Sequence, residues 1–79
     1  MNDPELFSVY QFFKDGAYER VRHAVDVGEA ADATLHYISC VAARTGLTRR
    51  VIVTNALDCT CFEWRYGEGV VFPGKEGNP

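Results

Sequence analysis

Residues 26–46 have the sequence DVGEAADATLHYISCVAARTG, and this stretch decides the fold. Asp26 followed three residues later by Glu29 matches a capping box, in which each side chain bonds a free backbone N–H at the start of a helix. Apolar residues then recur at spacings of three and four, which is typical of one helix face. Gly46 suits the left-handed conformation that ends many helices. The stretch therefore predicts one amphipathic helix from Asp26 to Gly46.

The flanking segments, residues 7–25 and 51–72, each read as paired β-strands. Lys14-Asp15-Gly16 suits a three-residue hairpin loop with Phe13 opposite Ala17. A two-residue turn at Asp15-Gly16 is the alternative, and it would shift the second strand by one residue and mix the two faces differently.

In the second hairpin, strands from residues 50–54 and 59–66 are expected to pair around a loop at residues 55–58. That register places Arg50 opposite Glu63 and Val51 opposite Phe62. A tight turn at residues 67–69 would add a short final strand.

The predicted fold class is α+β, with a ββαββ order and an antiparallel sheet of four or five strands that carries one helix on one face. Residues 1–72 are expected to form a single domain. The Gly- and Pro-containing segment 73–79 is expected to be a disordered C-terminal tail. Two sets of side chains follow from the strand alternation. The core between helix and sheet is predicted to contain Leu35, Ile38, Val51, Val53, Phe62 and Trp64. The opposite, outer face of the sheet is predicted to present Tyr10, Phe12, Tyr18, Arg20, Arg22, Ile52 and Arg65.

Composition narrows the functional classes. The chain has 79 residues, of which 47% are hydrophobic and 24% charged, as in ordinary globular proteins. Its net charge of −3 lacks the basic excess that drives non-specific binding to nucleic acids. No apolar run has the length of a signal peptide or a membrane span, and three cysteines are too few for a disulfide framework. We therefore expect a cytoplasmic protein without a membrane role.

The cysteines and histidines are the first candidates for chemistry. Cys59 and Cys61 lie two apart, so their side chains would point the same way from a strand, but a structural zinc site needs four ligands. Cys40, His23 and His36 lie on other predicted elements without a recognisable pairing. We expect small, free thiols on the outer face at Cys59 and Cys61, and no metal or cofactor.

A cluster of Arg44, Arg49 and Arg50 follows the helix end and has the chemistry to recognise phosphate or carboxylate. Arginines at a helix C-terminus also complement its dipole, so a structural role explains the cluster as well. The sequence contains no glycine-rich phosphate loop and no nucleophile elbow, and no enzymatic activity is expected.

The outer face is the strongest candidate for function, because one helix covers one face of a sheet and exposed apolar patches mark interaction sites. The leading hypothesis is a non-enzymatic interaction module that forms a homodimer through this outer face or through sheet edges. The alternative is single-stranded nucleic-acid binding, with Tyr10, Phe12 and Tyr18 stacking on bases and Arg20, Arg22 and Arg65 meeting phosphates.

Overall fold

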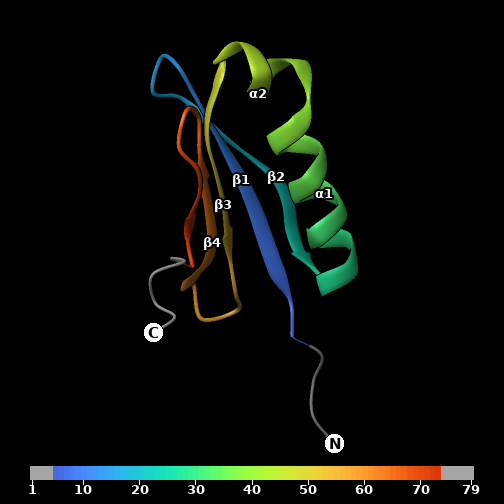
Figure 1. The fold of residues 1–79 in the computed structure, drawn as a ribbon. Helices are drawn as coiled ribbons and strands as arrows, with labels where there is room; N and C mark the ends of the chain where they lie inside the picture. The colour runs from blue at the N-terminus through green and yellow to red at the C-terminus, as the bar shows by residue number, and fades with distance from the viewer. Residues whose placement is uncertain (1–4, 74–79) are drawn as a thin grey trace, which may run out of the picture.

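The computed structural model describes residues 5–73, so the predicted tail lies outside the described residues except for Pro73. Five strands form one sheet with a helical segment packed on one face (Figure 1). The strands are β1 Phe7–Phe13, β2 Tyr18–Val25, β3 Thr48–Thr54, β4 Thr60–Arg65 and β5 Gly69–Phe72. The helices are α1 Val27–Ser39 and α2 Val41–Thr45. The α+β class is confirmed, with five strands.

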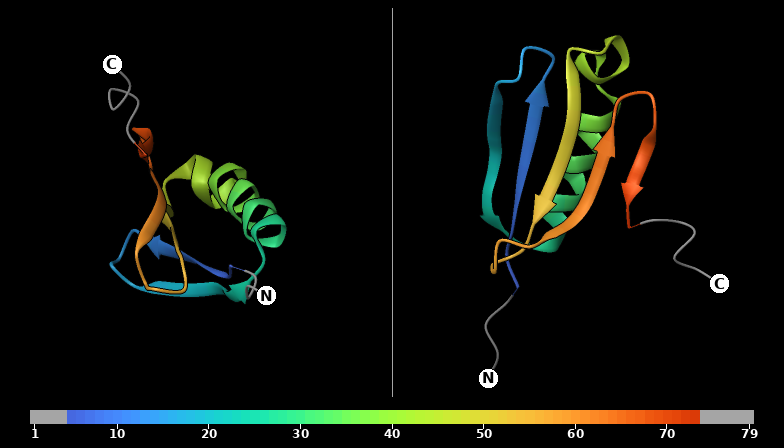
Figure 2. Two further views of the ribbon diagram at one scale, coloured as in Figure 1. Left: turned by 90° about the horizontal axis from the view of Figure 1, so that it is seen from below. Right: turned by 90° about the vertical axis from the view of Figure 1, so that its left-hand side faces the viewer.

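The sheet has the order β2-β1-β3-β4-β5, and every neighbouring pair is antiparallel. Strands β2 and β3 therefore run parallel on either side of β1, and the helical segment connects them across one face. We call this face the helix side and the opposite one the outer face. The sheet curves, so that β4 and β5 stand away from α1 (Figure 2).

The predicted helix is confirmed at both ends but is interrupted. Asp26 accepts a hydrogen bond from the Glu29 backbone N–H at 2.9 Å, and Gly46 adopts φ 87°. Between them Cys40 is extended, which separates α1 from α2. The Ser39 hydroxyl donates to the Leu35 carbonyl at 2.6 Å and so satisfies one of the acceptors left free at the end of α1. The apolar spacing runs on across the break, so periodicity alone does not reveal it.

The first hairpin has the predicted three-residue loop. The Phe13 N–H donates to the Ala17 carbonyl at 2.8 Å, and Gly16 has φ 92°. Beyond Tyr10, two irregularities then shift the register, so that Val9 lies opposite Arg22 and Phe7 opposite Val25. At the second of them Ala24 has φ 53°, and its N–H donates to the Ser8 hydroxyl at 3.1 Å. These bulges change the faces predicted for the second half of β2.

The predicted register of β3 and β4 is wrong by two residues. Val51 lies opposite Trp64 and Val53 opposite Phe62. A shift of two leaves each side chain on its predicted face, because strand side chains alternate with period two. A further irregularity between Val53 and Thr54 breaks this alternation near the start of β4, where Cys61 lies.

The core centres on small side chains of α1 packed against β1 and β3. Its buried members are Val9, Ala30, Ala33, Val51 and Val53. The predicted core residues Ile38, Phe62 and Trp64 are only partly buried, and they pack around this cluster.

Leu35, by contrast, is 65% exposed, so its predicted burial is wrong. The helix places Ala30, Ala33 and Thr34 toward the sheet, which turns Leu35 to its flank. The Thr34 hydroxyl is satisfied within the helix, because it donates to the Ala30 carbonyl at 2.7 Å. The apolar arc of α1 is wider than the contact, so spacing alone does not show which part of the arc faces the sheet.

Candidate functional site

Aromatic rings gather on the outer face of β1 and β2, as predicted. Tyr18 stacks on Phe12 with ring centroids 5.4 Å apart and an interplanar angle of 27°, and its centroid lies 6.3 Å from that of Tyr10. Tyr18 is 62% exposed, whereas Tyr10 and Phe12 are half-buried. Arg20 lies opposite Tyr10 in the ladder, and Ile52 lies opposite it on the other side. Five of the seven predicted residues therefore form one continuous surface.

Two residues absent from the predicted surface, Arg50 and Glu63, organise its β3–β4 part. The Arg50 guanidinium lies 4.9 Å from the centre of the Phe12 ring, within the range of a cation–π contact. Glu63 accepts hydrogen bonds from Arg50 Nε at 3.0 Å and from Arg65 Nε at 2.8 Å. The predicted register placed Arg50 directly opposite Glu63, whereas the two side chains meet diagonally across the observed register.

Burial by itself raises the pKa of Glu63, but the hydrogen bonds and positive charges of Arg65 and Arg50 outweigh it. The net result is a lowered pKa. The carboxylate is thus held in its charged form between two arginines, and Arg65 keeps its predicted place on the outer face.

Arg22 does not belong to the outer surface. Its Nε lies 3.4 Å from the Glu29 carboxylate of α1, and it donates to the Val21 carbonyl at 2.7 Å. The bulge at Val9 accounts for this, because two residues of β2 oppose one residue of β1 and the alternation of faces is lost there. Glu29, which was predicted to bond the Asp26 N–H, is instead engaged by this arginine.

His23 lies on the outer face of the sheet. Strict alternation from the predicted three-residue loop would place His23 on the core face with Val9 and Val21. In the structure it is exposed and lines a hollow of about 390 Å³ on the outer face. Tyr10, Arg20 and Asp58 line the same hollow. The sequence signal for this change is weak, because His23, Ala24 and Val25 form no pattern that marks a bulge.

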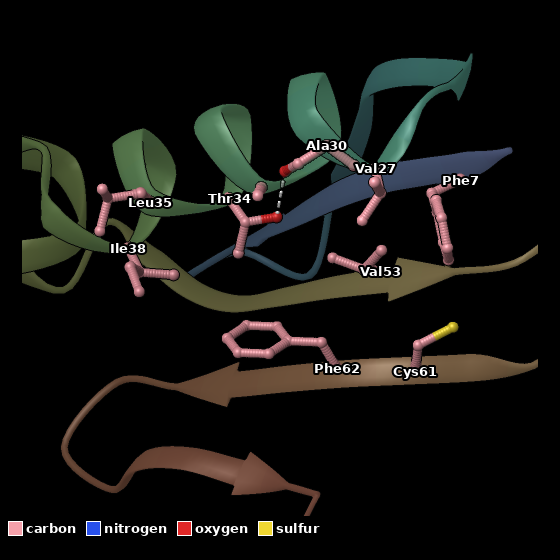
Figure 3. A pocket seen from close by; sticks show the side chains of 10 residues that line it. Phe7, Val27, Ala30, Thr34, Leu35, Ile38, Val53, Cys61 and Phe62 are labelled. Atoms are coloured by element: carbon pink, nitrogen blue, oxygen red, sulfur yellow. Dashed lines mark hydrogen bonds between the residues drawn. The ribbon is translucent and has the colours of Figure 1, made fainter. Parts of the chain in front are cut away.

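A second surface lies on the helix side, where the sequence predicted core. Helix α1 packs across β1, β2 and β3, and an open groove of about 360 Å³ runs between α1 and β4 (Figure 3). Six of the residues that define this groove are Phe7, Val27, Leu35, Ile38, Cys61 and Phe62.

The groove is almost entirely apolar. Of its lining residues, only Thr34 and Cys61 have polar side-chain atoms, and the Thr34 hydroxyl is already bonded within α1. Val27 and Leu35 are each 65% exposed along its helical wall. Such a surface offers no acid, base or activated nucleophile, but it provides contact area for an apolar partner.

The predicted placement of Cys61 on the outer face is wrong. Cys61 lines the groove on the helix side, whereas Cys59 is exposed in the loop before β4. Burial raises the pKa of the Cys61 thiol, with smaller contributions from the negative charges of Glu5 and Cys59. All three cysteines are free. Among residues 5–73, no group of three or more His, Cys, Asp or Glu side chains is placed to hold a metal ion.

The arginines near the end of the helical segment do not form one site. Arg49 lies over the Tyr66 ring at 5.1 Å, on the part of the chain where that ring packs against Gly46. Arg50 is directed to the outer face instead, and Arg44 lies in the last turn of α2. Strand alternation separates Arg49 from Arg50, so the cluster seen in the sequence divides between two faces.

Comparison with protein-family models, with curated proteins and with solved structures finds no match for this chain. Within the described part of the chain, no helix is long and apolar enough to cross a membrane.

Proposed function

We propose that this chain is a non-enzymatic protein-interaction module that forms a homodimer through the groove beside α1. The observation that carries this proposal is the apolar groove, which lies where α1 stops covering the sheet. This moves the expected homodimer interface from the outer face to the helix side.

The dimensions favour a second helix as the occupant. Neighbouring strands lie about 4.8 Å apart, so the axes of five strands span about 19 Å, whereas a helix with its side chains is about 10 Å wide. One helix over β1, β2 and β3 therefore leaves room for another beside it, over β4. Trp64 and Val70 are paired on this uncovered part, and Val70 is 40% exposed.

A second copy of the chain supplies a helix with suitable chemistry. Val27, Ala31 and Leu35 are spaced by four residues and follow the groove along α1. In a twofold dimer the same ridge of each copy would enter the groove of the other, because a twofold interface uses one self-complementary patch twice. Helix α1 of one copy then forms the wall of a groove, and α1 of the other copy fills it.

The outer face is the weaker candidate for this dimer because its apolar rings already have partners within the chain. Tyr18 covers one side of Phe12, and the Arg50 guanidinium lies over the Phe12 ring. Leu35 and Val27, in contrast, are each 65% exposed beside an apolar groove.

Light scattering of the purified protein over a range of concentrations tests the proposal. The wild type is expected at twice the chain mass of 8.8 kDa, and Leu35→Glu at the chain mass with its fold retained. A charge in a desolvated apolar contact costs several kcal/mol, which is enough to separate the copies. Leu57→Glu is the matched control, since Leu57 is 82% exposed in the loop before β4.

Two results would contradict the groove interface. One is a monomeric wild type at every concentration. The other is a dimer that persists in Leu35→Glu but dissociates in Phe12→Glu, which would return the interface to the outer face.

A further inference from the structure

The outer face remains free when two copies meet through their helix sides, so it can carry a second activity. Its most exposed ring belongs to Tyr18, whose stacking partner Phe12 lies beneath it at 5.4 Å. Phe12 is itself held by the Arg50 guanidinium at 4.9 Å. The result is a supported aromatic stack with its last ring open to solvent. A planar group that adds to Tyr18 extends an existing stack.

Positive charge lies around this stack. The outer face carries Arg20, Arg50 and Arg65. Glu63 is shared by Arg50 and Arg65, Glu68 lies close enough to Arg65 to raise its pKa, and Asp58 lines the hollow. No ion pair involves Arg20 among residues 5–73. Arg20 is therefore available to a phosphate, although the chain as a whole has a charge of −3.

Other exposed carboxylates lie away from the stack. Asp26, Glu29 and Asp32 are exposed at the start of α1, which follows the end of β2 opposite to Tyr18, and Glu29 is paired there with Arg22. The net charge of the sequence therefore does not describe the surroundings of Tyr18.

The hollow next to the stack has the size and chemistry for a phosphorylated group. Its volume of about 390 Å³ falls within the range of about 300–1,000 Å³ found for small-ligand sites. Arg20 and His23 line it together with the Tyr10 ring. Ring, arginine and open stack therefore follow one another along β1 and β2, an arrangement that suits successive bases and phosphates of a single strand.

We infer that the outer face binds single-stranded nucleic acid, with a base stacked on Tyr18 and a phosphate held by Arg20. The binding is independent of sequence, because stacking and phosphate contacts accept any base. Few phosphates are neutralised, so the affinity is low and depends on salt.

Fluorescence anisotropy with labelled single-stranded oligonucleotides of about twelve nucleotides tests this inference. Tyr18→Ala is expected to weaken binding about fivefold or more, while Tyr18→Phe retains it, because the ring and not the hydroxyl stacks. Arg20→Ala is expected to weaken binding and to lower the slope of log affinity against log salt by about 0.7. Arg49→Ala is the matched control, since this exposed arginine lies over Tyr66 and away from the outer stack.

The inference is overturned if the wild type binds no oligonucleotide at about 50 mM salt, where phosphate contacts are strong. It is also overturned if Tyr18→Ala binds as the wild type does, if Arg49→Ala loses as much affinity as Arg20→Ala, or if polyphosphate of equal charge competes as well as the oligonucleotide. Retained binding by monomeric Leu35→Glu is expected, and it separates this inference from the proposed dimer. A wild type that is monomeric yet binds through Tyr18 would reject the dimer alone.

Discussion

On the outer face of the sheet, Tyr18 rests on Phe12 and Arg50 lies over the Phe12 ring, whereas on the helix side Leu35 projects beside a groove that has almost no polar atoms. Both surfaces are rich in apolar side chains. They differ in what the chain itself places against them. Arginines and stacked rings partly cover the outer face, while the groove is left open because α1 is narrower than the sheet. An interface between copies therefore belongs where the chain leaves apolar surface without cover, and aromatic content alone does not locate it.

Two neighbouring residues of β3 are expected to contribute differently to the free energy of unfolding, because they lie on opposite faces. Val51 is fully buried on the helix side, and Ile52 is half-buried on the outer face. Val51→Ala is expected to lower the free energy of unfolding by about 2–3 kcal/mol, from the lost burial and the remaining cavity. Ile52→Ala is expected to cost about 1 kcal/mol, because half of the removed side chain is already hydrated.

Urea denaturation at one fixed protein concentration measures both costs, since the stability of a dimer depends on concentration. If Ile52→Ala proves as costly as Val51→Ala, the outer face is covered in solution and the contrast between the two surfaces fails.

A smaller effect concerns acid stability. The pKa of Glu63 is lowered in the folded state, so its stabilising contribution is present above its unfolded pKa of about 4.3 and is lost as pH falls through the folded value. Glu63→Gln is expected to cost about 0.5–1 kcal/mol at neutral pH and nothing once the wild-type carboxylate is protonated.

Thermal unfolding between about pH 2 and pH 7 tests this expectation, because the stabilising contribution of Glu63 is expected to be lost below the ordinary glutamate pKa of about 4.3. Glu29→Gln is the control on the helix side. The Glu29 carboxylate pairs with Arg22 but is more exposed than the Glu63 carboxylate, so its removal is expected to change acid stability less. A Glu63→Gln curve parallel to that of the wild type would show that the outer arginines do not depend on this carboxylate.

The smallest expected effect is a difference in the alkylation rates of Cys59 and Cys61. The raised pKa of Cys61 leaves less thiolate at pH 8, so iodoacetamide is expected to modify the exposed Cys59 before Cys61. In a dimer that closes the groove, Cys61 should be protected further, and Leu35→Glu should remove that protection. Mass spectrometry of peptides from a time course reports both rates. Equal rates at Cys61 in the wild type and in Leu35→Glu would indicate an open groove.

Several local features could be predicted because they depend on residues close together in the chain. Gly16 permits the loop that joins Phe13 to Ala17, Asp26 caps the following helix, and Gly46 ends the helical segment with positive φ. The aromatic part of the outer face was also predictable, since it lies next to the loop, before any irregularity of β2.

The tertiary structure decided the strand order, the interruption at Cys40 and the flank of α1 that faces the sheet. It also placed Arg22 on the helix side, His23 on the outer face and Cys61 in the groove. The bulges responsible are not marked by any local residue pattern. The physical reason is range. Caps and turns are governed by sterics and hydrogen bonds within a few residues, whereas the rotation of a helix and the placing of a bulge depend on how all five strands and α1 pack together. The groove results from that packing, since it exists only because α1 covers part of the sheet.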